Sequence, residues 1–259
     1  MQANSKNTEN TPLVSVIIPA YNAERFIAKT LESVICQTYS NWEALVLDDG
    51  SRDDTIGIVN RFVEQDSRIR LYQNPQNMGV AATRNRGIEL SSGEFVAFLD
   101  SDDVWHADKL EKQLQRAETA QADIVYCSYA LVQEKDGSRR DYIVPEETDY
   151  EKMLYENVLG CSTVMLKRKL VEQQKFDVNF YHEDYALWLK LLRNGAKAAG
   201  ISQVLVDYTV IENSRSFNKW NAAKKRWQVW KAQERISVRK RLILLSRYAF
   251  RGVVKHWGE

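Results

Sequence analysis

The chain has 259 residues, of which 44% are hydrophobic and 27% are charged, and these values exclude disorder for most of its length. The opening segment lacks the apolar core of a signal peptide, and no apolar run reaches the roughly 18 residues of a membrane-spanning helix. We therefore expect a cytoplasmic globular protein. Cys36, Cys127 and Cys161 are widely spaced without a CxxC pair, which argues against a zinc site or a disulfide framework and favours reduced core cysteines.

Strand-like and helix-like segments alternate along the first hundred residues. Apolar β-branched runs bounded by turn residues indicate strands, and apolar residues at helical spacing indicate helices. The expected strands lie at 13–22, 42–51, 68–74 and 93–103, and the expected helices lie at 24–39, from Ile56 to Val63, and within 77–90. This alternation predicts an α/β fold with a mostly parallel sheet covered on both faces, whose ligands bind beyond the carboxyl ends of the strands.

The loops after the first two expected strands carry an aromatic ring, an amide and two carboxylates. Pro19, Ala20, Tyr21 and Asn22 end the first strand, and Asp48 and Asp49 end the second. A carboxylate beside an aromatic ring can accept the N3 hydrogen of a uracil while the ring stacks on the base. The structural alternative for "DDGSRDDT" is a glycine turn with Ser51 or Asp53 capping the next helix, but capping does not account for Asp48 and Asp49.

The third loop, "NMGVAATRNRG", leads into a helix and carries two arginines. Arg84 or Arg86 can neutralise a pyrophosphate, because guanidinium groups pair with phosphate oxygens in a fixed geometry. The alternative is an ordinary helix start with solvated arginines. This segment alone does not decide between the two.

The fourth expected strand, in "FVAFLDSDDVW", ends in Asp100, Asp102 and Asp103. Two carboxylates about 4 Å apart repel by roughly 4 kcal/mol at an effective dielectric near 20, so the cluster needs a cation, a proton or open water. A divalent metal is one solution, because hard cations take carboxylate oxygens as ligands. A solvated turn with an Asx cap ahead of the next helix is the other.

A later segment, "FYHEDYALWLKLLRNG", predicts a helix that ends at Gly195 with Glu183 and Asp184 in its first turn. Acidic residues there compensate the helix dipole, which is the ordinary explanation for an isolated instance. They can also take a proton from an attacking hydroxyl group. His182 is a further candidate base, although a lone histidine before a helix is more often a cap or a packing residue.

Taken in order, "SVIIPAYNAERFIAKTLESV", "DDGSRDDT", "NMGVAATRNRG", "FLDSDDVW" and "HEDYALWLKLL" resemble the inverting family 2 glycosyltransferases from about Leu13 to Tyr208. The resemblance implies the GT-A fold and a nucleotide-diphospho-sugar donor, with a UDP-sugar favoured. It also implies Mn²⁺ or Mg²⁺ held by Asp102, with Asp103 as a second contact, and Asp184 as the catalytic base assisted by Glu183. The implied donor-binding residues are Pro19, Ala20, Tyr21, Asn22, Asp49, Gly79, Arg84, Asp100 and Ser101. Thr83 departs from the alanine that is more usual in the family.

The segment after Lys219 is strongly basic, although the formal net charge of the chain is only +1. Basic residues exceed acidic ones there by about ten, and they alternate with aromatic and aliphatic residues. We expect a flexible N-terminus at 1–12, a GT-A domain at 13–215 and a basic, aromatic-rich helical tail at 216–259. The tail suits an anionic membrane surface, or its apolar residues pack on the domain. Nucleic acid is disfavoured because no recognition motif accompanies the charge.

The stretches around the HED segment are similar to those of enzymes that build cell-wall or exported polysaccharide, so we expect a saccharide or lipid-linked saccharide acceptor. Three other functions were open from the residues alone. A phosphatase of the haloacid dehalogenase type fits "DSDDV", but there the motif follows the first strand. A nucleotidyltransferase would carry a Gly-rich, Arg-bearing loop in place of "PAYNAER". A nucleotide-sugar-binding scaffold without turnover would not need Asp102 and Asp184.

Overall fold

The structure is a computed structural model that describes residues 11–180, 182–211, 219–232 and 236–246. Most of the expected N-terminal segment 1–12 and the expected domain boundary between residues 215 and 216 lie outside the described residues. No helix in the described part of the chain is long and apolar enough to cross a membrane. The cysteines are free, as expected, but Cys36 is exposed and only Cys127 and Cys161 are buried.

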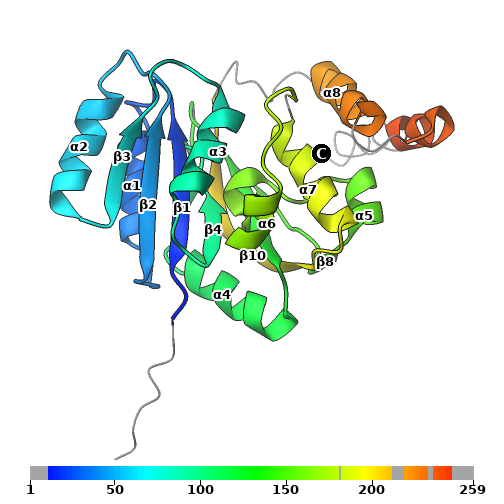
Figure 1. Ribbon diagram of the computed structural model, residues 1–259, viewed down its shortest axis with the longest axis horizontal. Helices are drawn as coiled ribbons and strands as arrows, with labels where there is room; N and C mark the ends of the chain where they lie inside the picture. The colour runs from blue at the N-terminus through cyan, green and yellow to red at the C-terminus, as the bar shows by residue number, and fades with distance from the viewer. Residues whose placement is uncertain (1–10, 181, 212–218, 233–235, 247–259) are drawn as a thin grey trace, which may run out of the picture.

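One mixed sheet of ten strands organises the chain (Figure 1). Its order is β3-β2-β1-β4-β9-β6-β10-β5, with β7 paired to β6 and β8 paired to β10. The strands are β1 Val14–Ala20, β2 Trp42–Asp48, β3 Ile69–Gln73, β4 Phe95–Phe98, β5 Val104–Trp105, β6 Ile124–Gln133, β7 Arg139–Tyr142, β8 Glu147–Thr148, β9 Met165–Lys167 and β10 Ala198–Val210. The first four strands are parallel, as expected from the alternating pattern.

Helices cover both faces of this sheet (Figure 1). They are α1 Ile27–Ile35, α2 Thr55–Gln65, α3 Val80–Leu90, α4 Lys109–Ala120, α5 Tyr150–Tyr155, the 3-10 turn η1 Cys161–Thr163, α6 Arg168–Gln173, α7 Glu183–Arg193 and α8 Lys219–Ala232. Residues 238–246 are also helical. Alternate residues of β1 serve the two faces, because side chains of a strand point to opposite sides: Ile17 belongs to the core with α3, α6 and α7, whereas Val16 and Ile18 pack with α1, α2 and α4. All seven residues of β1 are buried, which is why its sequence is almost continuously apolar.

The strand β9 interrupts the parallel arrangement. It lies antiparallel between β4 and β6, and it follows directly on η1. This insertion brings residues 160–164 beside the end of β4, where Asp100 to Asp103 begin. The alternating pattern of the first hundred residues gives no indication of this contact.

The described half of the basic tail packs on the domain. Val229 and Trp230 are buried in the same core as α7, and the Trp230 Nε1–H donates to the Tyr185 hydroxyl at 3.0 Å. Leu244, in helix 238–246, belongs to that core as well. The packing explanation therefore holds for these inward-facing residues.

Two glycines inside helices provide a test of how closely the layers pack. A Cβ at Gly87, in α3, would lie 2.5 Å from Ile17 Cγ2 of β1, in the filled core. We expect Gly87→Ala to lower the free energy of unfolding by about 1–3 kcal/mol, as overpacked core substitutions do. Urea denaturation measures this change.

The matched control is Gly57→Ala in α2, where the added Cβ would meet only the flexible carboxylate end of Asp54. Because alanine is a better helix former than glycine, we expect unchanged stability or a gain of up to about 1 kcal/mol. A gain at both positions would contradict the tight contact between α3 and β1.

Candidate functional site

The first two loops are fastened to each other. Asn22 has a positive φ of 49°, and its side-chain oxygen accepts a hydrogen bond from the Arg52 N–H at 2.9 Å, while its own N–H donates to Ser51 Oγ. Pro19 and Ala20 are buried in β1. Tyr21, in contrast, is 46% exposed. The ring of Tyr21 is therefore the group of this loop that is available to stack on a base.

Asp48 and Asp49 both hold backbone turns. Asp48 Oδ2 accepts from the N–H groups of Gly50 and Ser51 at 3.1 and 3.2 Å, so local turn capping does account for this residue, contrary to our expectation. Asp49 Oδ1 accepts from the Met78 N–H at 2.8 Å, and its Oδ2 accepts from the Gly79 N–H at 2.9 Å. Asp49 is 4% exposed. A uracil contact for Asp49 stays a prediction.

The loop before α3 is closed by the same network. The Asn74 side-chain amide donates to Asp49 Oδ1 at 2.8 Å and to the Thr83 hydroxyl at 2.9 Å. Gly79, the N-cap of α3, has φ of 85°, a conformation that suits glycine. Arg86 donates to the Gln73 carbonyl at 2.6 Å and so fixes the end of β3. Because its hydroxyl accepts the Asn74 hydrogen bond, Thr83 has a structural role in this chain.

Arg84 lies buried between two carboxylates that are far apart in sequence. Its Nη1 donates to Glu183 Oε1 at 2.7 Å, and its Nη2 donates to Asp100 Oδ1 at 2.6 Å. Only 5% of the Arg84 side chain is exposed. The guanidinium group joins the loop after β4 to the first turn of α7, and both of its terminal nitrogens are used within the protein.

The loop after β4 is held in place by hydrogen bonds to η1 and β10. Ser162 Oγ accepts from the Asp100 N–H at 3.1 Å and donates to Asp103 Oδ2 at 2.6 Å, and Asp103 Oδ1 accepts from the Thr209 N–H at 3.1 Å. The Ser101 carbonyl accepts from the Thr30 hydroxyl at 3.0 Å. Asp108 is the N-cap residue of α4, and its side chain makes no capping hydrogen bond.

Asp102 and Asp103 differ in their surroundings. Asp103 is 2% exposed, and burial, then the charges of Asp102 and Asp100, raise its pKa. Asp102 is partly exposed, and burial and the charge of Asp100 raise its pKa to about 6. Within the described chain, its carboxylate meets no hydrogen-bond donor except its own backbone N–H. Asp102 is thus the member of the cluster that lacks a compensating partner.

Glu183 and Asp184 begin α7, as predicted. Glu183 is buried, and its pKa is raised by burial and by Asp184, an effect that Arg84 offsets only in part. Asp184 is partly exposed, and its Oδ1 accepts from the Tyr185 N–H at 2.7 Å. His182 is the N-cap residue of α7, without a capping bond from its side chain.

The carboxylates that follow β4 and those that begin α7 both lie close to one buried residue, Cys161. The buried Cys161 thiol, at the start of η1, has a pKa raised by burial, lowered by Arg84, and raised again by Asp100, Asp184 and Glu183. All of these charges therefore lie within electrostatic reach of one sulfur atom. Sequence reasoning did not identify Ser162, Thr209 or Tyr208, whose hydroxyl accepts from the Ser162 N–H at 3.0 Å. The position of "CSTVML" before the HED segment was a signal for Ser162 alone.

The residues at the end of β4 suit a hard divalent cation. Asp102 offers oxygen ligands that meet no donor of the described chain besides the residue's own backbone N–H, and Asp100 adds a second carboxylate beside it. No group of three or more His, Cys, Asp or Glu residues in the described chain is arranged to hold a metal by itself. A cation here would have to complete its shell with water and with oxygens of a bound phosphate, as Mg²⁺ commonly does.

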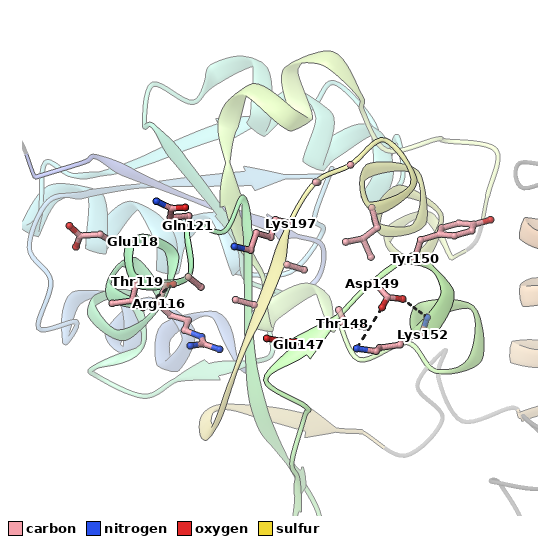
Figure 2. A pocket seen from close by; sticks show the side chains of 16 residues that line it. Arg116, Glu118, Thr119, Gln121, Glu147, Thr148, Asp149, Tyr150, Lys152 and Lys197 are labelled. Carbon is pink, nitrogen blue, oxygen red and sulfur yellow. Dashed lines mark hydrogen bonds and ion pairs between the residues drawn. The ribbon is translucent and has the colours of Figure 1, made fainter.

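A separate polar pocket of about 780 Å³ lies where β6 and β10 begin, at the opposite edge of the sheet (Figure 2). Side chains from α4, β8 and α5 line it, with Asp149 and Lys152 paired at 3.6 Å. Its charges are mixed, because Arg116 and Lys197 line it together with Glu118 and Glu147. None of the predicted site residues belongs to this pocket.

Sequence comparisons connect the chain with a group of transferases. The profile described as Glycosyl transferase family 2 matches residues 15–174. A Bacillus subtilis (strain 168) protein with the provisional name teichuronic acid biosynthesis glycosyltransferase TuaG is 39% identical over 246 residues, covering 94% of this chain and 97% of the relative. An Escherichia coli protein named UDP-Glc:alpha-D-GlcNAc-diphosphoundecaprenol beta-1,3-glucosyltransferase WfgD is 39% identical over 219 residues, covering 84% of this chain and 85% of that protein.

Two solved structures share the fold. S. aureus TarS 1-349 in complex with UDP-GlcNAc has a TM-score of 0.71 at 21% identity, over 91% of this chain and 71% of that chain. The mannosyltransferase PcManGT from Pyrobaculum calidifontis, in complex with GDP-Man and Mn²⁺, has a TM-score of 0.70 at 21% identity, over 92% of this chain and 69% of that chain. These likenesses confirm the predicted GT-A fold.

The buried ion pairs of Arg84 can be tested by substitution. Arg84→Met leaves two carboxylates without their buried cation, and we expect a loss of about 3–5 kcal/mol of stability at neutral pH. Removing the arginine raises the folded-state pKa of Glu183 further above its unfolded value, so this loss should shrink as the pH falls from neutral and Glu183 is protonated. Chemical denaturation over a series of pH values from neutral to acidic measures the effect.

The control is Arg70→Met, because Arg70 pairs with Glu43 at 3.2 Å but is 53% exposed. An exposed pair contributes only about 0–1 kcal/mol. Combining Arg84→Met with Glu183→Gln should recover part of the loss, with a coupling of about 0.5–3 kcal/mol. Additive losses in the double variant would show that Arg84 and Glu183 act independently.

Proposed function

The chain belongs to glycosyl transferase family 2, and from this premise we propose that it moves a sugar from a UDP-sugar to a saccharide or lipid-linked saccharide acceptor. The observation that carries the proposal is the convergence of Asp100 with Glu183 and Asp184 around Arg84 and Cys161, with Asp102 beside Asp100. Asp100 and Asp102 serve the leaving diphosphate, and Glu183 and Asp184 serve the incoming hydroxyl group. The family match also favours transfer over the phosphatase and nucleotidyltransferase alternatives.

The donor would lie across the carboxyl ends of β1, β2 and β4. Tyr21 stacks on the base, because its ring is the exposed aromatic group of the first loop. Asp100 and Asp102 face the diphosphate, and Asp102 holds Mn²⁺ or Mg²⁺. When bound, this cation stabilises the negative charge that develops on the β-phosphate as the sugar leaves. Arg84 holds Asp100 in position, because one of its terminal nitrogens donates to that carboxylate while the other donates to Glu183.

The acceptor reacts from the opposite side of the sugar. Its hydroxyl oxygen forms a bond to the anomeric carbon, the bond from that carbon to the β-phosphate oxygen breaks, and UDP leaves with both electrons of that bond. Asp184 takes the hydroxyl proton, and the single displacement on the face opposite the leaving group inverts the anomeric carbon. Glu183 is held by Arg84 and positions the first turn of α7. Asp103, with both carboxylate oxygens occupied, supports the loop and is a weaker candidate for the metal contact.

The WfgD relative is named for a lipid-linked acceptor and a UDP-sugar donor. Its name supports the same pair of substrates for this chain, in the synthesis of a cell-surface polysaccharide at the inner face of the membrane.

Metal dependence is tested through Asp102. We expect UDP to bind more tightly with Mn²⁺ than with EDTA, and Asp102→Ala to remove most of that difference. Titration calorimetry measures both, with Asp136→Ala in an exposed loop as the matched control. Equal UDP affinity with and without EDTA in the unsubstituted protein would refute the metal assignment.

The base is tested through Asp184. Asp184→Asn should retain donor binding while transfer falls by about 10² to 10⁴, the usual effect of losing a general base. Initial rates of UDP release with a lipid-linked acceptor, measured beside UDP affinity, separate the two effects. Near-normal turnover in this variant would assign the base to Glu183 or His182.

A further inference from the structure

Helix 238–246 is apolar on two sides. Its inner side packs on the domain through Leu244, which is 1% exposed, and through Arg241, whose guanidinium group lies 4.5 Å from the centre of the Trp227 ring. Its outer side carries Val238, Leu242 and Ile243, which are 54–55% exposed. Positions 238, 239, 242, 243 and 246 share one face of a helix, so these aliphatic side chains lie together around the exposed Arg239.

This outer face is unusual for the molecule. Seven large hydrophobic residues of the described chain are exposed, and three of them are in this nine-residue helix. The other four are Tyr21, Met78, Ile143 and Val178, which are scattered over different loops. A cluster of exposed aliphatic side chains marks an interaction surface, whereas single ones are ordinary.

The charge around this face indicates the partner. The described residues of the tail, 219–232 and 236–246, contain eight lysines and arginines and no aspartate or glutamate. Lys224, Lys231 and Arg239 are exposed. A second copy bound through the same face would bring these like charges together across a two-fold axis. An anionic lipid surface supplies the opposite charge and an apolar layer for the aliphatic side chains.

Specific contacts hold the helix in a fixed position relative to the candidate base. The Ile236 N–H donates to the Trp230 carbonyl at 2.9 Å, and Lys240 pairs with Glu151 of α5 at 3.0 Å. Trp230 is bonded to Tyr185, which follows Asp184 directly. Figure 1 shows helix 238–246 beside α8, beyond α5 and α7. A chain that contacts a bilayer through the outer face would therefore hold α7, which carries the candidate base Asp184, in a fixed position relative to the membrane.

We propose that the outer face of helix 238–246, formed by Val238, Arg239, Leu242 and Ile243, docks on the surface of an anionic membrane. The described part of this helix, residues 238–246, is too short to cross a bilayer, and we place it in the headgroup region with its aliphatic side chains inserted. The docking extends the proposed function, because a lipid-linked acceptor then reaches Asp184 without leaving the membrane. Only this purpose rests on the proposed function; the docking itself does not.

Flotation of the full chain with phosphatidylcholine vesicles, with and without phosphatidylglycerol, tests the proposal. We expect binding only with phosphatidylglycerol and a marked loss in high salt, because charges are screened over about 3 Å at 1 M ionic strength against about 10 Å at 0.1 M. The substitution Leu242→Ser with Ile243→Ser should weaken the apparent affinity at least about tenfold, since both side chains lose their apolar contact with lipid.

The matched control is Ile143→Ser with Val178→Ser, which removes two aliphatic side chains of similar exposure, 62% and 61%, from other surfaces. It should bind like the unsubstituted chain, and thermal unfolding should show that both double variants are folded. Equal binding of the two double variants, or no binding of the unsubstituted chain at low salt, overturns the proposal. So does light scattering that finds a dimer which the Leu242 and Ile243 substitutions dissociate while lipid binding is unchanged.

The measurement involves no sugar transfer. A chain that binds vesicles but has no activity would refute the proposed function alone. A chain that is active on a detergent-solubilised acceptor but does not bind vesicles would refute the docking alone.

Discussion

The candidate site depends on one buried guanidinium group. Five carboxylates, those of Asp100, Asp102, Asp103, Glu183 and Asp184, are brought to one edge of the sheet, and such a concentration of negative charge resists burial. Arg84 pairs with Asp100 and with Glu183 and so joins the loop after β4 to the start of α7. Because a buried charge is strongly unfavourable without its partner, this contact fixes the distance between the donor side and the acceptor side of the site.

The remaining carboxylates are stabilised in different ways, and the differences separate support from chemistry. Asp103 accepts two hydrogen bonds in a buried position, and Asp49 accepts three. These residues hold loops. Asp102 and Asp184 are partly exposed, and neither is paired with a cation within the described chain. Groups that must exchange a metal or a proton need this accessibility, and we therefore assign the reaction to them.

The tail extends the same arrangement outward. Trp230 contacts Tyr185, so the segment that our proposal places against lipid is attached one residue from the proposed base. Its inward-facing residues belong to the core, and its outward-facing residues do not. The two explanations of the basic tail, packing on the domain and contact with a membrane, therefore apply to opposite sides of the same segment.

The parallel strands, the helices between them and the acidic loops follow from the sequence alone, because hydrophobic period and turn residues are local properties. The ordered motifs also predict reacting groups at Asp102 and Asp184, and these roles stay predictions. Which of the polar residues are hydrogen-bonded to other parts of the chain depends instead on the tertiary fold. The segment around Arg84 predicts a phosphate ligand, but Glu183, 99 positions later, accepts one of the hydrogen bonds of Arg84. The acidic loop predicts a metal contact at Asp103, but Ser162 of η1 and Thr209 of β10 donate hydrogen bonds to its two carboxylate oxygens. Such contacts depend on chain crossings such as the antiparallel insertion of β9, which no local pattern encodes.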